Sequence, residues 1–231
     1  MSFPCSIGRL TNIKEFSLDW FKYMNPPLPQ LIQSAIGEDF LSMLRTFCQI
    51  LLKDDKHEVD LVDFLRYFSE LHFDINAIDN RQKTLLHHAA SNGDLGVLRA
   101  LIRSNSNLNI LDKDDCTPLC VAIRESQFEA AKMLIEAGAD VNIGGGVYGS
   151  ALHLAIVRTD LVLTDMMIKR GADVNIADSE GNTPLHFIMN VFSKNESKYK
   201  AIAECLVLSG AKPNAKNYEY WCPLHISARK G

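Results

Sequence analysis

Histidine and cysteine recur at one position of a repeated tetrad, and they are the side chains whose types could do chemistry in this chain. An imidazole or a thiol beside a hydroxyl can serve as a general base, a nucleophile or a metal ligand. The residues concerned are His87, Cys120, His153, His186 and His225. A catalytic role occurs once per protein, whereas a structural role occurs once per repeat. The recurrence therefore favours a structural role for this position.

Other candidate ligands and catalytic motifs give no alternative site. Cys116 and Cys120 lie far along the sequence from His225 and lack the spacing of zinc ligands. No GxxxxGK[ST] loop, HExxH helix, GxSxG elbow or EF-hand loop occurs in the sequence. We therefore expect no catalytic residue, no metal site and no cofactor, and we expect that the chain is not an enzyme.

The tetrads that carry these residues define an internal repeat. They are TLLH at 84, TPLC at 117, SALH at 150, TPLH at 183 and CPLH at 222, with three intervals of 33 residues and one of 39. An asparagine lies eight residues before the start of each tetrad, at positions 76, 109, 142, 175 and 214. Two markers in one phase across five units are hard to obtain by chance, so the sequence predicts an array of stacked units.

Each unit carries the signals of two helices. Thr or Ser begins four of the tetrads and suits an N-cap, and the prolines at 118 and 184 suit the first helical position. A second helix follows, with an apolar triplet at a constant offset that predicts one shared buried face. The triplets are 100–102, 133–135, 166–168 and 205–207. We expect Gly138, Gly171 and Gly210 to close three of these helices in the left-handed conformation, with Asn105 in that place in the first.

The repeat resembles the ankyrin repeat over roughly residues 60–231, where GADVN occurs at 138 and 171 and SGAKPN at 209. The resemblance implies an all-α solenoid with β-hairpin-like fingers at right angles to the helices. It also implies that the tetrad histidine bonds its own Thr and the backbone of the neighbouring finger. A helix pair of this size cannot cover its own apolar face, so neighbouring units must stack to share a core.

The expected organisation is a helical amino-terminal cap over 1–76, which includes a degenerate repeat, followed by ankyrin repeats over 77–231. The repeat bounds are about 77–109, 110–142, 143–175, 176–214 and a partial 215–231. The last unit stops within its first helix and leaves an apolar edge. We interpret the chain as a fragment of a longer ankyrin protein; the alternative is that a partner covers this edge.

Two places depart from the repeat. NIGGGVYGS at 142–150 has Gly145 in place of a turn aspartate such as Asp178, so this third finger is either more flexible or pressed close to another backbone. Neutral drift in a tolerant loop is the alternative. The fourth repeat carries six extra residues in NVFSKNESKYKA, whose polar SKNESK predicts an exposed loop between its two helices. A binding role and a neutral insertion both remain open there.

Composition excludes several function classes. The 231 residues are 47% hydrophobic and 23% charged, which is typical of a globular protein. The net charge of −4 gives no overall attraction to nucleic acid. No apolar run approaches the roughly 18 residues that span a bilayer, and the six cysteines show no disulfide framework. We expect a cytoplasmic chain, with the nucleus as an alternative, that neither binds nucleic acid nor inserts into a membrane.

The resemblance implies that a partner contacts the finger tips and the exposed face of the first helices, which together form the concave face. These offsets select Asn80, Arg81, Lys83, Asn92, Lys113, Asp114, Arg124, Glu125, Val147, Arg158, Glu180, Asn182, Asn190, Tyr218 and Trp221 as partner-binding. They also select Ser91, Cys116, Gly146, Gly149, Val157, Ser179, Val191, Glu219, Arg229 and Lys230.

Across the whole concave set seven side chains are basic and four are acidic. This excess on a negatively charged chain suggests a partner with an acidic segment. Tyr218 and Trp221 are of the aromatic types that anchor interfaces; alternatively, Trp221 packs on a further repeat. The expected function is a non-enzymatic protein–protein interaction module, a scaffold or adaptor. The alternative is a regulatory ankyrin domain of a larger enzyme or channel.

Overall fold

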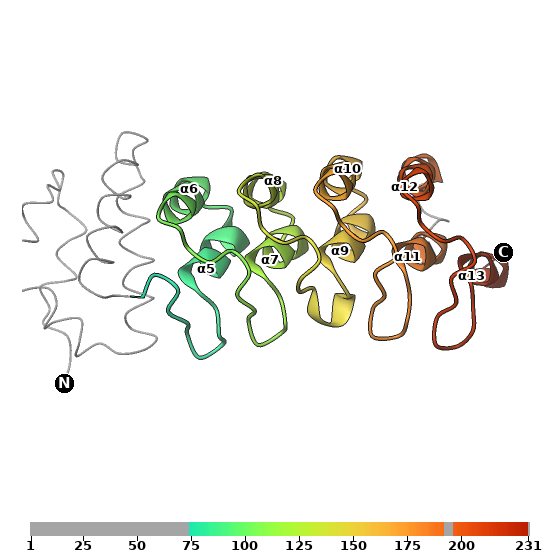
Figure 1. Ribbon diagram of the computed structural model, residues 1–231, viewed down its shortest axis with the longest axis horizontal. Helices are drawn as coiled ribbons and strands as arrows, with labels where there is room; N and C mark the ends of the chain where they lie inside the picture. Colours follow the sequence, from blue (N-terminus) through green and yellow to red (C-terminus); the bar gives the residue numbers. More distant parts are fainter. Residues whose placement is uncertain (1–73, 192–195, 231) are drawn as a thin grey trace, which may run out of the picture.

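Two parallel rows of helices build the molecule, which a computed structural model describes over residues 74–191 and 196–230 (Figure 1). The row of first helices contains α5 (Leu85–Asn92), α7 (Pro118–Arg124), α9 (Ala151–Val157), α11 (Pro184–Val191) and α13 (Pro223–Lys230). The row of second helices contains α6 (Leu95–Arg103), α8 (Phe128–Glu136), α10 (Leu161–Lys169) and α12 (Glu196–Leu208). Finger loops project beside the first helices. The predicted all-α solenoid is confirmed, whereas the predicted cap at 1–76 lies almost wholly outside the described residues.

The first helices begin where the sequence places their caps. The hydroxyls of Thr84, Thr117 and Ser150 each accept a hydrogen bond from the backbone N–H three residues on. Pro118 and Pro184 are the first residues of α7 and α11. Proline suits this position because the N–H that it lacks has no partner within the helix.

The second helices end as predicted. Gly138, Gly171 and Gly210 have φ of 92°, 86° and 93°, and Asn105 has φ of 57°. A Cβ on any of the three glycines would meet no atom within 4 Å. The glycines are therefore needed for the left-handed backbone and not for space.

A continuous core lies between the two rows. The middle residues of the apolar triplets, Leu101, Leu134, Met167 and Leu206, are all 0% exposed. Burial of each such side chain contributes about 1.5–3 kcal/mol. The four second helices thus share one buried face as predicted, although the last triplet residue of α12, Val207, is 48% exposed.

The marker asparagines join each repeat to the next. The side-chain oxygens of Asn76, Asn109, Asn142 and Asn175 each accept a hydrogen bond from a backbone N–H of the following repeat, at 2.8 or 2.9 Å. The bonded residue lies 31 positions on in the first three cases and 37 in the fourth. These bonds explain why the asparagine keeps its phase with the tetrad despite the six-residue insertion.

The insertion in the fourth repeat lengthens a helix. α12 has 13 residues, whereas α6, α8 and α10 have nine. Residues 196–198 form its first turn, so the loop prediction is wrong for this half of the SKNESK segment. Tyr199 anchors this turn in the core at 6% exposure. Residues 193–195 of the segment lie outside the described residues.

The fingers are tight loops, and none of the described residues forms a β-strand. In the second finger the Asp112 N–H donates to the Cys116 carbonyl at 2.9 Å, and the Asp112 carboxylate accepts two backbone N–H bonds. Asp79, Asp178 and Asn217 make the same bonds in the first, fourth and fifth fingers. A single cross-loop bond does not make a ladder, so the predicted hairpins are loops closed by a turn residue.

Candidate functional site

Neighbouring fingers are joined by backbone hydrogen bonds at three of their four junctions. The Lys113 N–H donates to the Arg81 carbonyl at 3.0 Å, and the Tyr218 N–H donates to the Glu180 carbonyl at 3.1 Å. The third finger bonds to the second, because the N–H groups of Gly145 and Gly146 donate to Asp115. Within the described residues, no backbone hydrogen bond joins the third finger to the fourth.

The glycine-rich third finger owes its position to a close backbone approach. It forms the short 3₁₀ helix η3 (Gly146–Tyr148), which lies at the foot of α9 in Figure 1. A Cβ on Gly146 would lie 2.1 Å from the Asp114 carbonyl oxygen, and the φ of Gly146 is 53°. Only glycine fits this contact. The prediction that the finger is pressed against another backbone is thereby confirmed, and the finger is held against the second repeat.

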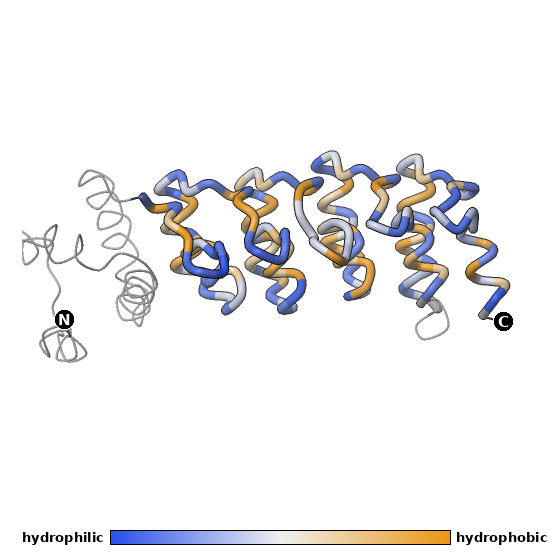
Figure 2. Tube along the Cα trace, turned by 90° about the horizontal axis from the view of Figure 1, so that it is seen from below, coloured by the Kyte–Doolittle hydropathy of each residue, from blue (hydrophilic) through white to orange (hydrophobic). Residues whose placement is uncertain are grey.

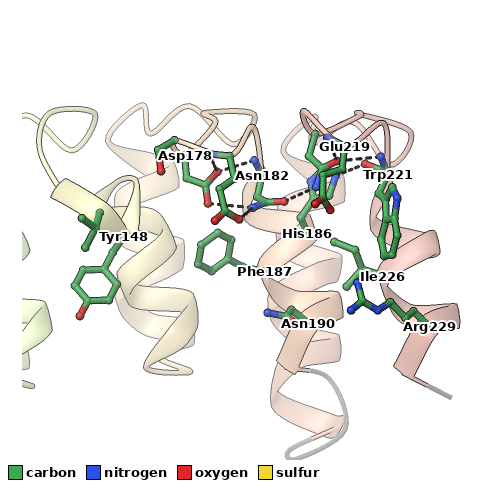
Figure 3. Close-up of a pocket in the computed structure, with 14 residues that line it drawn as sticks. Tyr148, Asp178, Asn182, His186, Phe187, Asn190, Glu219, Trp221, Ile226 and Arg229 are labelled. Atoms are coloured by element: carbon green, nitrogen blue, oxygen red, sulfur yellow. Dashed lines mark hydrogen bonds between the residues drawn. The ribbon is translucent and has the colours of Figure 1, made fainter.

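A hollow of about 460 Å³ opens between the third finger and the fourth and fifth repeats (Figure 3). Its apolar part consists of Val147, Tyr148, Phe187, Trp221 and Ile226. Its polar part includes Asp178, Glu180, Asn190, Glu219 and Arg229. The elements that position these side chains are η3, α11, α13 and the last two fingers.

Two aromatic rings in the apolar part of the hollow are held in place by contacts with neighbouring side chains. The Phe187 ring lies against the buried His153 ring, with 4.7 Å between the ring centroids and 57° between the planes. The Arg229 guanidinium lies over the Trp221 ring, 4.9 Å from its centroid. Val147 and Tyr148 are 82% and 45% exposed. The hollow therefore combines fixed aromatic rings with apolar surface that is open to solvent.

Two asparagines fix the finger side of the hollow. The Asn217 amide donates to the Asn182 side-chain oxygen at 2.9 Å, and the Asn182 amide donates to the carboxylates of Asp178 and Glu180, each at 3.2 Å. Among the described residues, no salt bridge involves Asp178, Glu180 or Glu219. The finger side of the hollow thus carries negative charge that no basic side chain neutralises.

The tetrad histidines connect neighbouring repeats through hydrogen bonds. The Nε2 atoms of His87, His153 and His186 bond carbonyl oxygens of the next finger at 3.0 or 3.1 Å, and their Nδ1 atoms bond their own Thr or Ser. Burial lowers the pKa of His87, and it lowers the pKa of His153 to about 4. These two imidazoles are therefore neutral at pH 7. The predicted structural role is confirmed for these three positions.

The second repeat has a thiol at this position. The Cys120 Sγ lies 3.8 Å from the Ile143 carbonyl oxygen, and burial raises its pKa to about 11. It is neither a nucleophile nor a metal ligand in this state. The described residues contain no group of three or more His, Cys, Asp or Glu that could hold a metal ion. In the fifth repeat, His225 is exposed, and its Nδ1 accepts a hydrogen bond from the Cys222 N–H.

Two ankyrin models match the sequence, one for three ankyrin repeats over residues 46–144 and one for a single ankyrin repeat over 180–218. Together they match more than half of the chain. The chain belongs to the ankyrin repeat family. The segment between the two matches, 145–179, begins within the glycine-rich third finger.

The ankyrin fold is also found by comparison of structures. The chain is similar to the crystal structure of EF0377, an ankyrin repeat protein, with a TM-score of 0.64 and 18% sequence identity. The similarity covers 75% of this chain and 91% of the other. No curated protein matches the chain significantly. Ankyrin repeats are in general protein–protein interaction modules, and their fold is typically non-enzymatic. No described helix is both long and apolar enough to cross a bilayer.

The ankyrin array uses part of the predicted basic set for its own contacts. The Lys83 Nζ lies 3.9 Å from the Asp112 carboxylate. Arg124 contacts Asp114 and Glu125 at 4.0 and 3.3 Å, and it donates to the Cys116 Sγ at 3.5 Å. The guanidinium of Arg158 donates to the Arg124 carbonyl at the end of α7.

The other two basic residues of the first two fingers, Arg81 and Lys113, are exposed, and neither forms a salt bridge among the described residues. Asn80 is exposed on the first finger, and Asn92 is exposed at the end of α5. The Asn92 amide donates to the Asp94 carboxylate at 3.3 Å. None of these residues reaches the hollow.

The hollow brings together residues from the carboxyl-terminal part of the predicted set. The predicted residues that line it are Val147, Ser179, Glu180, Asn182, Asn190, Glu219, Trp221 and Arg229. Tyr218 does not line the hollow but packs against Gly181, where an added Cβ would lie 2.9 Å from the Tyr218 ring. The sequence offsets missed the other residues that line the hollow, which are Tyr148, Asp178, His186, Phe187, Asn217 and Ile226. The aromatic Tyr148 within an irregular finger was the signal that could have identified the first of them.

Proposed function

We propose that this ankyrin array is a non-enzymatic protein-interaction module, a scaffold or adaptor that holds a partner on its concave face. The observation that carries the proposal is the hollow, where exposed apolar side chains and unpaired carboxylates converge on fixed elements. Aromatic residues in such positions anchor protein interfaces, and a surface that is already ordered loses little entropy when it binds.

Binding is better supported than catalysis by the groups that surround the hollow. His186 lies at its edge, but both of its ring nitrogens are engaged, with Thr183 and with the Trp221 carbonyl. Among the described residues, no hydrogen bond joins the hydroxyls of Ser179 and Tyr148 to a base that could activate them as nucleophiles. The finger carboxylates and the aromatic rings are suited to recognition.

The same partner has a second place to bind at the other end of the concave face. Arg81 and Lys113 extend from the first and second fingers, and their exposed cationic groups can each bond an acidic side chain of the partner. We place this function in the cytoplasm, or in the nucleus, because the sequence has cysteines without a disulfide framework. Cys116 and Cys120 are buried thiols, as expected of a protein in a reducing compartment.

A pair of charge insertions tests the proposed function. Val147→Lys places a charge in the hollow, whereas Leu208→Lys places one at the end of α12, where the side chain is 88% exposed. We expect partner proteins captured by the wild-type chain to be retained by Leu208→Lys and lost with Val147→Lys. Loss with Leu208→Lys alone would move the binding surface to the second helices and contradict the proposal.

A further inference from the structure

The hollow has two chemically different sides. On the finger side lie Asp178 and Glu219, and farther along the helices lie Asn190 and Arg229 (Figure 3). Glu180 belongs to the same finger as Asp178, and its carboxylate bonds the Asn182 amide. The apolar rings occupy the space between the two sides. A segment bound in the hollow would therefore meet acceptors at one edge and a cation at the other.

The finger carboxylates differ in how far the protein already uses them. Asp178 accepts two backbone N–H bonds within its own turn and one from the Asn182 amide. Glu180 accepts only from the Asn182 amide, and the Glu219 carboxylate has no hydrogen bond among the described residues. Both are exposed. Glu180 and Glu219 are thus the two carboxylates that can accept hydrogen bonds from a bound cation.

The apolar floor beside these carboxylates can receive a large side chain. Phe187 is held against His153, and Ile226 lies beside Trp221 in the next repeat (Figure 3). Tyr148 closes the hollow on the side of the third finger (Figure 3). A side chain that enters here removes apolar surface of both molecules from water.

We propose that the hollow binds a partner segment in which a large apolar side chain lies next to a lysine or arginine. The apolar side chain occupies the floor between Phe187 and Ile226, and the cationic group bonds Glu180 and Glu219. Arg229 sets the direction of the segment, because it disfavours a cation on the helix side and favours a carbonyl or carboxylate there. This inference rests on the proposed function and names the chemistry of the segment that the hollow takes.

Charge complementarity selects this occupant over an acidic one. A partner carboxylate on the finger side would face Glu180 and Glu219, and like charges placed together oppose association. The exposed Arg81 and Lys113 lie three and two fingers away from Glu180, and their cationic groups suit an acidic stretch. The concave face therefore distinguishes the two ends of a bound partner by charge.

Peptide selection with a charge swap tests this inference. Random linear peptides displayed on phage are selected on the full chain, and the recovered peptides are synthesised with a fluorescent label for anisotropy titrations. We expect the recovered sequences to pair Lys or Arg with a large apolar residue. The variant Glu180→Lys/Glu219→Lys should weaken their binding at least about tenfold, and peptides with Glu in place of the basic residue should regain affinity for that variant.

The variant Arg81→Glu/Lys113→Glu reports on the second proposed binding place, at the other end of the concave face. The matched control is Glu136→Lys/Glu204→Lys, which makes the same two charge reversals at exposed positions of α8 and α12 outside the hollow. Retention of the peptides by this control supports the inference, provided that thermal unfolding shows all three variants to be folded. Peptides that require Arg81 and Lys113 instead would leave the proposed function intact and overturn the basic and apolar segment. Peptides whose binding responds to neither pair would overturn both.

Discussion

The two halves of the concave face are built from the same repeat. They differ in the backbone bonds between their fingers and in the contacts that their charged side chains make. In the half formed by the first two fingers, a backbone bond joins the fingers, and Lys83 and Arg124 contact carboxylates of the array. In the half formed by the last three, the third finger is bonded to the second and not to the fourth. The difference shows how one irregular finger can open a hollow in a regular array.

The two halves of the concave face also differ in polarity. Figure 2 shows the first and second fingers as hydrophilic and the third as nearly neutral in hydropathy. The excess of basic residues counted along the sequence overstates the charge offered to a partner. Arg124 and Arg158 are engaged within the array, and Glu180 and Glu219 are not paired. The charge that a partner meets depends on this pairing and not on the count.

The largest expected effect comes from the contact that sets the third finger apart. Gly146→Ala should lower the free energy of unfolding by about 2–4 kcal/mol, because its Cβ would lie 2.1 Å from a carbonyl oxygen at a positive φ. Gly138→Ala is the control, since its Cβ would meet nothing and only the left-handed conformation costs about 1 kcal/mol. Urea unfolding of both variants measures the difference. Equal losses would mean that the close approach does not shape the finger.

Acid should distinguish the interfaces held by imidazoles from the one held by a thiol. The pKa of His153 is about 4 in the folded chain, against about 6.5 when unfolded, so the unfolded chain binds the extra proton first as pH falls. Stability is then complete above about pH 6.5 and is lost progressively down to about pH 4, by roughly 1–3 kcal/mol. Burial shifts the pKa of His87 in the same direction.

At Cys120 the thiol stays neutral through this range, because burial raises its pKa to about 11. Unfolding measured at several pH values should show this loss of stability in the wild-type chain. The loss between the same pH values should be smaller in His153→Gln. An NMR titration of His153 with a midpoint near pH 6.5 would contradict the buried neutral state.

An aromatic side chain of the hollow should matter more for binding than an equally aromatic one outside it. Tyr148→Ala should weaken the selected peptides about tenfold, equivalent to about 1.4 kcal/mol, because it removes one wall of the hollow. Tyr220→Ala should leave affinity unchanged, since Tyr220 is 77% exposed on the fifth finger and does not line the hollow. Anisotropy titrations compare the two. A greater loss with Tyr220→Ala would place the site at the fifth finger tip.

Much of the array follows from local chemistry that the sequence displays. The Thr and Ser caps, the left-handed glycines and the phase of Asn109 with its tetrad each reflect one short-range or repeated bond. The hollow does not follow from such rules, because it depends on where the third finger runs in space. Gly145 and Gly146 indicated a close approach, but only the structure shows that the approach is to Asp115 and Asp114. It also shows that no backbone bond among the described residues joins the third finger to the fourth.

The helix α12 and the basic set show the same limit. The SKNESK segment has a loop-like composition, yet its second half is helical because Tyr199 anchors the first turn in the core. Arg158 occupies a concave offset, yet its guanidinium bonds the end of α7. Pairing between residues far apart in the sequence decides both outcomes, and no local pattern encodes it.

The smallest expected effect separates a basic residue that the array uses from one that it leaves free. Arg158→Ala removes a charge-assisted hydrogen bond to the last carbonyl of α7, which should cost about 0.5–1 kcal/mol of stability because the side chain is exposed. Arg81→Ala should cost less than about 0.5 kcal/mol, since it removes neither a salt bridge nor a cap. Thermal unfolding in low salt resolves a difference of this size when the two variants are measured side by side. If Arg81→Ala proves the more destabilising, the first half of the concave face uses its exposed basic residues internally as well, and the proposed place for an acidic stretch of the partner would be lost.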